Sequence, residues 1–312
     1  MNYTLDFNDI ELVPEKHTLD NEIDINLKTL ITERYGLNIP LIYPPDTDID
    51  PYEMALEMAK LGGVGCIHSS MKIKEQVDIV RKLSYSIYGD GFGGFIAEDW
   101  GIFDDDWHSE LAYVPIMCEV ELGEMGKKRA KELTEAGCHI ILIRSLSGYH
   151  KNVIDMVRWC RENLDPKVDI VVGEFTNEAG MVETISEGVN GLLVGCSNSK
   201  GNNPAINAGF TSSNITNLEK LDSITNIPII SVGKMNSISN IAKALAVGAN
   251  SVILDDLNLE DTKLEYGKRK TITPTISEII KYLKLALKLA NARNLKEYIP
   301  TYNVVSNFNK IK

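Results

Sequence analysis

Short apolar runs alternate with amphipathic stretches along most of the chain. The clearest case is residues 226–257, where the apolar run IPIISV is interrupted by Gly233, and Ser237 or Ser239 can cap the helical pattern that follows. That pattern stops at Gly248, and SVIL then resumes as a second apolar run. Continuous apolar strands joined by a crossover helix are typical of a parallel sheet covered by helices. The pattern therefore predicts a βαβ unit here.

The same alternation recurs from residue 39 onward. It predicts strands, each followed by a helix, at residues 39–43, 63–68, 114–120, 139–144, 169–175, 191–195, 227–232 and 251–254. Such a count of strand-and-helix repeats is that of a TIM (β/α)8 barrel. We therefore predict an α/β fold with a single barrel domain over residues 1–312.

Three segments lie outside these repeats. The pattern of apolar and polar positions in residues 1–37 predicts an N-terminal arm or hairpin across one end of the barrel. Residues 88–109 combine glycines with aromatic residues and lack a helical period, which is typical of a lid-like loop or of a surface or subunit-contact loop. Residues 275–295 form an amphipathic pattern that predicts a helix closing the barrel, with a partner-binding helix as the alternative.

Composition narrows the class of protein. The net charge of −12 over 312 residues argues against a nucleic-acid partner, which needs a basic surface. No apolar run is long enough to span a membrane, and the first residues lack the features of a signal peptide, so we expect a cytoplasmic protein without a membrane partner. The five cysteines are scattered and show no C-x-x-C pairing, which indicates reduced thiols.

Charged side chains follow most of the predicted strands. Functional residues of an α/β barrel gather where its strands end, so we take the following as candidate ligand-binding residues: Asp46, His68, Glu119, Arg144, Glu174, Lys234, Asp255 and Asp256. We expect only one of Glu119 and Glu121 to point into the barrel mouth. Because side chains alternate along a strand, only one of Asp255 and Asp256 can do so. Carboxylates still outnumber cations there.

Three hypotheses account for this set. The carboxylates can pair with Arg144 and Lys234 in a buried network that only closes the barrel. They can bind a divalent cation together with His68, although no compact metal motif is present and we assign no residue as a metal ligand. They can bind a cationic small ligand, or Lys234 can serve as an amine nucleophile, although nearby carboxylates would raise the pKa of its ammonium group.

Several stretches resemble the IMP dehydrogenase and GMP reductase family. LDFNDIELVP is similar to the opening of that family, and NIPLI with MALEMAKLGGVGCIH is similar to its first two strands. KEQVDIVRK, KKRAKELTEAG, KNVIDMVRW and IAKALAVGANSV match further segments in order, so that the resemblance covers roughly residues 3–260. It implies a TIM barrel and a homo-oligomer, a tetramer in the usual case. The CBS pair that many IMP dehydrogenases insert is missing.

The positions that the resemblance implies for catalysis differ. Asn202 stands where the family has the cysteine that attacks the purine, and an amide cannot form that adduct. Cys196 lies six residues earlier and is a candidate displaced nucleophile. Val232, Gly233 and Lys234 replace the Asp-Gly-Gly that holds ribose and phosphate, and Asp255 with Asp256 replaces the Gly-Ser of the phosphate cup.

We therefore expect a divergent barrel that has lost the cysteine-dependent purine nucleotide oxidoreductase reaction. It is either a non-catalytic homologue or a barrel adapted to a different small ligand. The alternatives are an active oxidoreductase that uses Cys196, for which NAD(P) would be the cofactor, and a divalent-metal-dependent enzyme. Arg144 and Glu174 also replace, respectively, an aspartate near the cofactor and an asparagine of the family. No cofactor is otherwise predicted.

Overall fold

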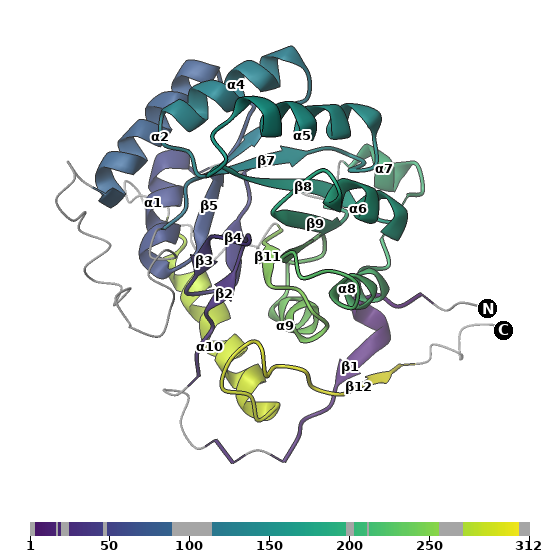
Figure 1. The fold of residues 1–312 in the computed structure, drawn as a ribbon. Helices are drawn as coiled ribbons and strands as arrows, with labels where there is room; N and C mark the ends of the chain where they lie inside the picture. Colours follow the sequence, from purple (N-terminus) through teal and green to yellow (C-terminus); the bar gives the residue numbers. More distant parts are fainter. Residues whose placement is uncertain are drawn as a thin grey trace.

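The computed structural model describes residues 4–16, 18–19, 25–45, 49–88, 114–197, 203–210, 212–255 and 271–305. Among these, eight strands form a closed barrel with parallel neighbours (Figure 1). In chain order they are β4 (Leu41–Tyr43), β5 (Val64–Ile67), β6 (Met117–Val120), β7 (Ile140–Arg144), β8 (Asp169–Phe175), β9 (Gly191–Gly195), β10 (Ile229–Val232) and β11 (Ser251–Ile253). The predicted TIM (β/α)8 barrel is confirmed.

Helices surround the barrel on its outside (Figure 1). Those that follow barrel strands are α1 (Pro51–Leu61), α2 (Ile73–Tyr88), α4 (Glu124–Glu135), α5 (Lys151–Asn163), α6 (Glu178–Ile185), α8 (Asn214–Asp222), α9 (Ile238–Ala246) and α10 (Thr273–Leu289). Ser237 caps α9, because its side chain accepts a hydrogen bond from the amide of Asn240 at 3.2 Å. In α10 the buried residues are Ile276, Ile279, Leu283 and Leu287. They belong to the hydrophobic core, so α10 packs on the molecule through this apolar face.

The N-terminal arm fills the end of the barrel at which the strands begin. Its hairpin consists of β2 (Thr29–Leu30) and β3 (Gly36–Leu37). Ile31 and Leu37 from this hairpin belong to the apolar cluster inside the barrel. The hydroxyl of Thr29 donates to the carbonyl of Asn250 at 2.7 Å, just before β11. Side chains of the arm therefore close this end, and the opposite end remains as the mouth.

The two ends of the described chain pair with each other beside α9. The short helix η1 (Phe7–Asp9) leads into β1 (Ile10–Leu12), which pairs antiparallel with β12 (Tyr302–Val304). The polar stretch between β9 and α8 contains a further short helix, α7 (Pro204–Asn207). The sequence pattern predicted neither feature, because each segment is too short to show a period.

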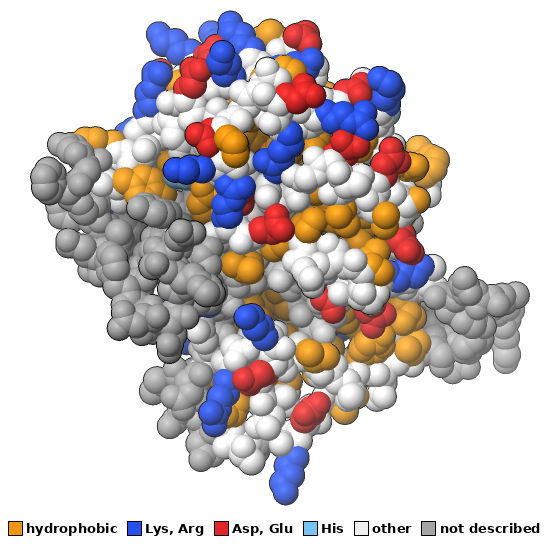
Figure 2. Space-filling model, viewed as in Figure 1, with side chains coloured by type: hydrophobic (Ala, Val, Ile, Leu, Met, Phe, Trp, Pro, Cys, Tyr) orange, Lys and Arg blue, Asp and Glu red, His pale blue; other side chains and the backbone are white. Residues whose placement is uncertain are grey.

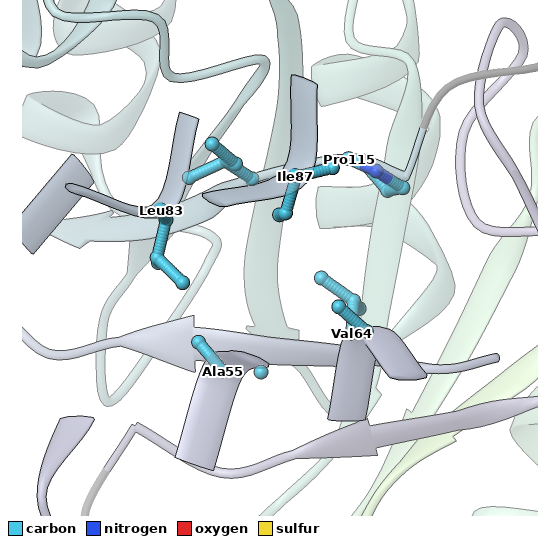
Figure 3. Close-up of a pocket in the computed structure, with 8 residues that line it drawn as sticks. Ala55, Val64, Leu83, Ile87 and Pro115 are labelled. Carbon is cyan, nitrogen blue, oxygen red and sulfur yellow. The ribbon is translucent and has the colours of Figure 1, made fainter. Parts of the chain in front are cut away.

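The helical layer is tightly packed against the strands. Figure 3 shows a void between α1, α2 and β5, with Ala55, Val64, Leu83, Ile87 and Pro115 around it. Its volume is about 10 Å³ and its lining is apolar. A space of that size and polarity has no partners for a water molecule, so it is a packing defect and not a binding site.

Charged residues of both signs cover the outer helices. Figure 2 shows Lys, Arg, Asp and Glu side chains interspersed over α4 and α5. Several form pairs along one helix, such as Lys127 with Glu124 at 2.7 Å and Lys151 with Asp155 at 2.6 Å. Within the described residues, no helix has the length and apolar character that crossing a bilayer requires.

One predicted segment and three predicted site positions fall wholly or largely outside the described residues. The lid-like loop at 88–109 is described only at Tyr88. The hydroxyl of Tyr88, at the end of α2, donates to the carbonyl of Val114, shortly before β6. Both flanks of the segment therefore lie at the end where the strands begin, opposite the mouth. Asn202, Asp46 and Asp256 also lie outside the described residues.

Candidate functional site at the barrel mouth

Charged side chains form the uppermost layer inside the barrel. The apolar interior includes Met117 of β6, Leu142 of β7 and Ile253 of β11. Because side chains alternate along a strand, the residues two positions further on point the same way. These residues are Glu119, Arg144 and Asp255. Together with Glu174 of β8 and Ser197 after β9, we call them the mouth cluster.

Glu119 and Glu121 point to different sides. They are two residues apart and would share a face in a continuous strand, but β6 ends at Val120, so Glu121 lies outside it. Glu121 turns toward the helices, where its carboxylate binds the guanidinium of Arg129 at 2.6 Å. Arg129 also donates to the side chain of Gln76 at 2.7 Å, and Gln76 donates to the carbonyl of Glu119 at 3.1 Å. This outer network fixes the end of β6 from behind, so Glu119 is the glutamate of this strand that faces the interior.

Arg144 and Glu174 form the central ion pair of the mouth cluster. Both Nε and Nη2 of Arg144 lie 3.0 Å from Oε1 of Glu174. The other carboxylate oxygen accepts a hydrogen bond from the amide of Ser197 at 2.9 Å. Glu174 is 4% exposed, so both of its oxygens have partners inside the protein. This pair links β7, β8 and the loop after β9.

The carboxylate of Asp255 accepts hydrogen bonds from the backbone amides that follow β10. Its Oδ2 accepts from the amide of Met235 at 3.0 Å, and the carboxylate also accepts from the amide of Lys234. Its Oδ1 lies 3.3 Å from the hydroxyl of Ser197, which donates to it. Successive amides in a turn form a concavity that binds anions. In this chain the anion in that concavity is the carboxylate of Asp255.

The turn after β10 has a backbone that suits this arrangement. Gly233 has φ 87° and Lys234 has φ 62°, both in the left-handed region. A Cβ atom on Gly233 would lie 2.1 Å from the carbonyl oxygen of Cys196. Only glycine therefore fits there, because the ends of β9 and β10 are in direct contact.

Burial and like charges perturb the ionisation of the cluster. Burial raises the pKa of Glu174, and Asp255 raises it further, against the opposing effects of Arg144 and the Ser197 amide. Burial also raises the pKa of Asp255, against the amide of Met235 and the hydroxyl of Ser197. For Arg144, burial alone would lower the pKa, but Glu174 and Glu119 raise it. The guanidinium of Arg144 therefore stays charged, and it is the positive charge that compensates the nearby carboxylates.

Lys234 does not join this network. Its ammonium group forms an ion pair with Asp6 of the N-terminal arm, and its side chain is 51% exposed. Asp6 also caps η1, where its carboxylate accepts from the amide of Phe7 at 2.9 Å. The sequence-based prediction that Lys234 pairs with the carboxylates of the mouth is therefore wrong. Lys234 contributes its backbone amide to the mouth and its side chain to the arm.

Cys196 is a buried thiol. It is 7% exposed, and its sulfur accepts a hydrogen bond from the side chain of Asn203 at 3.4 Å. Burial and the nearby carboxylate of Glu174 raise the pKa of this thiol to about 11, against the opposing effect of Arg144. The thiolate is the nucleophilic form of cysteine. This environment suppresses it. All five cysteines are free and buried, as the sequence indicated.

His68 lies at the end of β5, with its Nδ1 2.6 Å from the hydroxyl of Ser70. Among the described residues, no group of three or more His, Cys, Asp or Glu side chains is placed to hold a metal ion. The metal site proposed from sequence also included Asp46, which lies outside the described residues. In the described part of the mouth, Glu174 is paired with Arg144 and Asp255 is bound to backbone amides, so these carboxylates do not form a set of metal ligands.

The family resemblance implies a nicotinamide cofactor near the end of β7, beside an aspartate. Arg144 occupies that position, and Glu174 engages its guanidinium at 3.0 Å. At this position the described residues therefore do not offer the carboxylate that the resemblance implies.

The closed parallel barrel with polar residues at the carboxyl ends of its strands defines the class of protein, a TIM barrel of the kind that binds small molecules at this end. Residues 4–262 match the model of the IMP dehydrogenase / GMP reductase domain. The chain belongs to this family.

Its relatives include inosine-5'-monophosphate dehydrogenases from several organisms. The protein from Cryptosporidium parvum is 29% identical over 293 residues, which cover 87% of this chain and 72% of that protein. The protein from Borreliella burgdorferi is 26% identical over 280 residues, covering 81% of this chain and 69% of that protein. A shorter match to the Streptococcus pyogenes protein is 42% identical over 84 residues, 27% of this chain and 17% of that protein.

Proposed function

We propose that this chain is a non-catalytic member of its family, which has lost the cysteine-dependent oxidoreductase reaction on purine nucleotides. The observation that carries the proposal is the position of Asp255, whose carboxylate accepts from the amides of Met235 and Lys234 after β10. In this family the backbone after that strand holds the phosphate of the nucleotide. A carboxylate of the chain itself supplies the negative charge there.

The electrostatic consequence is unfavourable for a nucleotide. A phosphate dianion brought to about 4 Å from an ionised carboxylate is repelled by several kcal/mol, even at an effective dielectric constant of about 20. Glu174 and Glu119 add negative charge to the same layer, and one guanidinium opposes them. The mouth cluster thus excludes the anionic group of an IMP or GMP molecule in the position that its relatives use.

The chemical consequence is the absence of an active thiolate. With a pKa of about 11, only about one Cys196 in ten thousand is ionised at pH 7. The sulfur also lies against Asn203, which donates to it at 3.4 Å. Both features support a structural role for Cys196 and oppose the alternative in which it acts as a displaced nucleophile.

The test is a thermal-shift and turnover assay on the purified chain. We expect IMP and GMP to leave the melting temperature unchanged, and we expect no turnover with NAD or NADP. Saturable turnover that disappears in a Cys196→Ala variant would contradict the proposal and establish the displaced-nucleophile alternative.

The same assay separates the remaining alternatives. Chelation lowers the melting temperature if a divalent metal is part of the folded protein, because a ligand that binds only the native state stabilises it. A polyamine raises the melting temperature if the acidic mouth binds a cation. A non-catalytic barrel responds to neither.

We also propose that the chain is a cytoplasmic homo-oligomer, with a tetramer as the expected form. The support is its membership of a family whose members are usually oligomeric. Light scattering coupled to size-exclusion chromatography measures this directly. A monomer at micromolar concentration would contradict the expectation.

A further inference from the structure

The outer side of α10 carries an apolar stripe. The opposite side of the helix is buried in the core, but Tyr282, Leu285 and Leu289 remain 42%, 37% and 40% exposed. Residues three and four positions apart lie on the same side of a helix, so these three side chains form one stripe that faces away from the barrel. We call it the α10 face. It shares no residue with the mouth cluster.

The α10 face is also basic. Residues 279–296 contain no Asp or Glu, although the chain as a whole has a net charge of −12. Lys281, Lys284 and Lys288 are spaced three and four residues apart, so they follow one flank of the stripe. Lys281 is exposed at the surface. A surface of this kind is complementary to one that combines apolar side chains with carboxylates.

The outer side of α6 has this complementary composition. Ala179 and Val182 are exposed, Val182 at 50%. Glu178 and Glu183 are exposed on the two flanks of this apolar pair. Glu178 also lies 3.9 Å from Lys220, but the side chains of that pair are 51% and 56% exposed, so the interaction leaves the carboxylate accessible. We call this surface the α6 face.

Tyr149 extends the apolar part of the α6 face. It is 48% exposed and packs against α6 at Gly180, where an added Cβ atom would lie 2.6 Å from the Cβ atom of the tyrosine. The α6 and α10 faces lie on different sides of the barrel (Figure 1), because β8 and β11, the strands that precede these helices, are three strands apart. A single copy of the chain therefore cannot bring the two faces together.

We propose that the α10 face of one copy of this chain packs against the α6 face of a second copy. The apolar stripe of α10 covers Val182 and Tyr149, and the lysines beside it lie opposite Glu178 and Glu183. Charge argues against the symmetric contacts, because two α10 faces would oppose lysines and two α6 faces would oppose glutamates. The proposal rests on the homo-oligomer proposed above, for which it names the contact surfaces. Contacts between two different faces can repeat around a closed ring, such as the expected tetramer.

Reversal of the charge on each face of the full chain tests the proposal. One variant, Lys281→Glu/Lys284→Glu, makes the α10 face acidic, and the other, Glu178→Lys/Glu183→Lys, makes the α6 face basic. In each variant like charges meet at the contact. We therefore expect light scattering over a concentration series to show association weakened at least about tenfold by either variant.

An equimolar mixture of the two variants is expected to assemble again. The acidic α10 face of one variant meets the basic α6 face of the other, and the two unaltered faces also match. Recovery on mixing shows in addition that both variants are folded. The matched control is Lys128→Glu/Lys131→Glu, at exposed positions of α4 outside both faces, and we expect it to weaken association less than about twofold.

Carbodiimide cross-linking of the native oligomer needs no variant, because it joins an ammonium group to a nearby carboxylate. We expect peptide mass spectrometry to find a lysine of the α10 face linked to Glu178 or Glu183.

The proposal is wrong if the native chain is an oligomer that lacks this link, if the control weakens association as much as the face variants do, or if variants with native circular dichroism stay apart on mixing. These results leave the homo-oligomer intact and place its contact elsewhere. A native chain that is a monomer at micromolar concentration removes the homo-oligomer and this contact together.

Discussion

Arg144 holds the mouth cluster together because it is the only described cation among the inward-facing carboxylates. Its guanidinium lies 3.0 Å from Glu174, and both Glu174 and Glu119 raise its pKa. Removal of one partner of a buried pair leaves the other charge without compensation. The stability of the mouth therefore depends on this residue more than on any single carboxylate.

We predict that Arg144→Leu lowers the free energy of unfolding by about 3–5 kcal/mol, because it leaves Glu174 buried and unpaired. Denaturant titration measures this change. The double variant Arg144→Leu/Glu174→Leu removes both charges and is expected to recover most of the loss. Equal destabilisation in the single and double variants would contradict the role assigned to the ion pair.

His139 supplies a pH dependence of stability at the other end of the barrel. Burial lowers the pKa of its imidazole from 6.5 to about 4. Its Nδ1 accepts from the amide of Ile116 at 3.1 Å, and the rings of Tyr35 and Tyr88 lie 5.6 Å away on edge. The neutral form is thus favoured by folding. Its contribution is fully present above pH 6.5 and is lost as the pH falls from 6.5 toward 4.

We predict that this group alone lowers the free energy of unfolding by about 2 kcal/mol between pH 7.5 and pH 5. In His139→Asn an amide oxygen can still accept from Ile116, but no group titrates, so this part of the pH dependence disappears. Chemical denaturation of both proteins at the two pH values tests the prediction. If the two proteins lose stability in parallel, His139 is not the cause.

Sequence reasoning reached only part of the mouth cluster. The sequence left the inward-facing residue as either Glu119 or Glu121, and the contact of Glu121 with Arg129 decides between them. Ser197 and the amide of Met235 were missed, because two of their contacts, to Glu174 and to Asp255, come from backbone amides that no side-chain pattern reveals. The partner of Lys234 was also missed, since Asp6 is distant in sequence and meets it only because the arm packs on α9.

At the scale of elements, the start of α10 depends on a residue of another helix. Oε1 of Glu57 in α1 accepts from the amides of Ile272 and Thr273 at 3.1 and 2.9 Å, and the hydroxyls of Thr271 and Thr273 also donate to it. Burial alone would raise the pKa of Glu57, but these hydrogen bonds lower it. A carboxylate at a helix N-terminus satisfies amides that have no partner within the helix. Glu57 thus replaces a local cap.

We predict that Glu57→Ala lowers the free energy of unfolding by about 1–2 kcal/mol. The loss of stability is fully present above the usual pKa of a glutamate. It vanishes as the pH falls through the lowered pKa of Glu57 in the folded protein, because the carboxylate is then protonated in both the folded and the unfolded states. Thermal denaturation at neutral and acidic pH measures it. Glu162→Ala, at an exposed helical position of α5, is the control and is expected to change stability little.

The long elements were predictable from periodicity, and the short ones were not. All eight predicted barrel strands are present because each is an apolar run bounded by polar residues. The pairing of β1 with β12 and the helix α7 involve only a few residues each. Their formation depends on tertiary contacts, which outweigh local preference in such short segments.

At the scale of the whole molecule, the barrel is filled or closed at both ends by the chain itself. The arm inserts Ile31 and Leu37 at the end where strands begin. Arg144, Glu174 and Asp255 bridge the ends where strands finish. The family fold is retained, and the carboxylate of Asp255 occupies the amides of Lys234 and Met235. This combination is what the proposed loss of activity rests on.

Removal of that carboxylate should reopen the anion site. We predict that Asp255→Gly frees the amides of Lys234 and Met235 and allows the chain to bind inorganic phosphate, with Asp255→Glu as the control that retains the charge. Binding of phosphate by the glutamate variant as tightly as by the glycine variant would contradict the assigned role of the carboxylate.

Calorimetric titration of the unaltered chain with IMP is the decisive measurement for the role of Asp255. We expect no measurable heat of binding to the native protein and a saturable isotherm for Asp255→Gly. A saturable isotherm for the native protein, at the concentrations at which the glycine variant binds, would show that the mouth accepts the nucleotide with Asp255 in place and that the proposed loss of nucleotide binding is wrong.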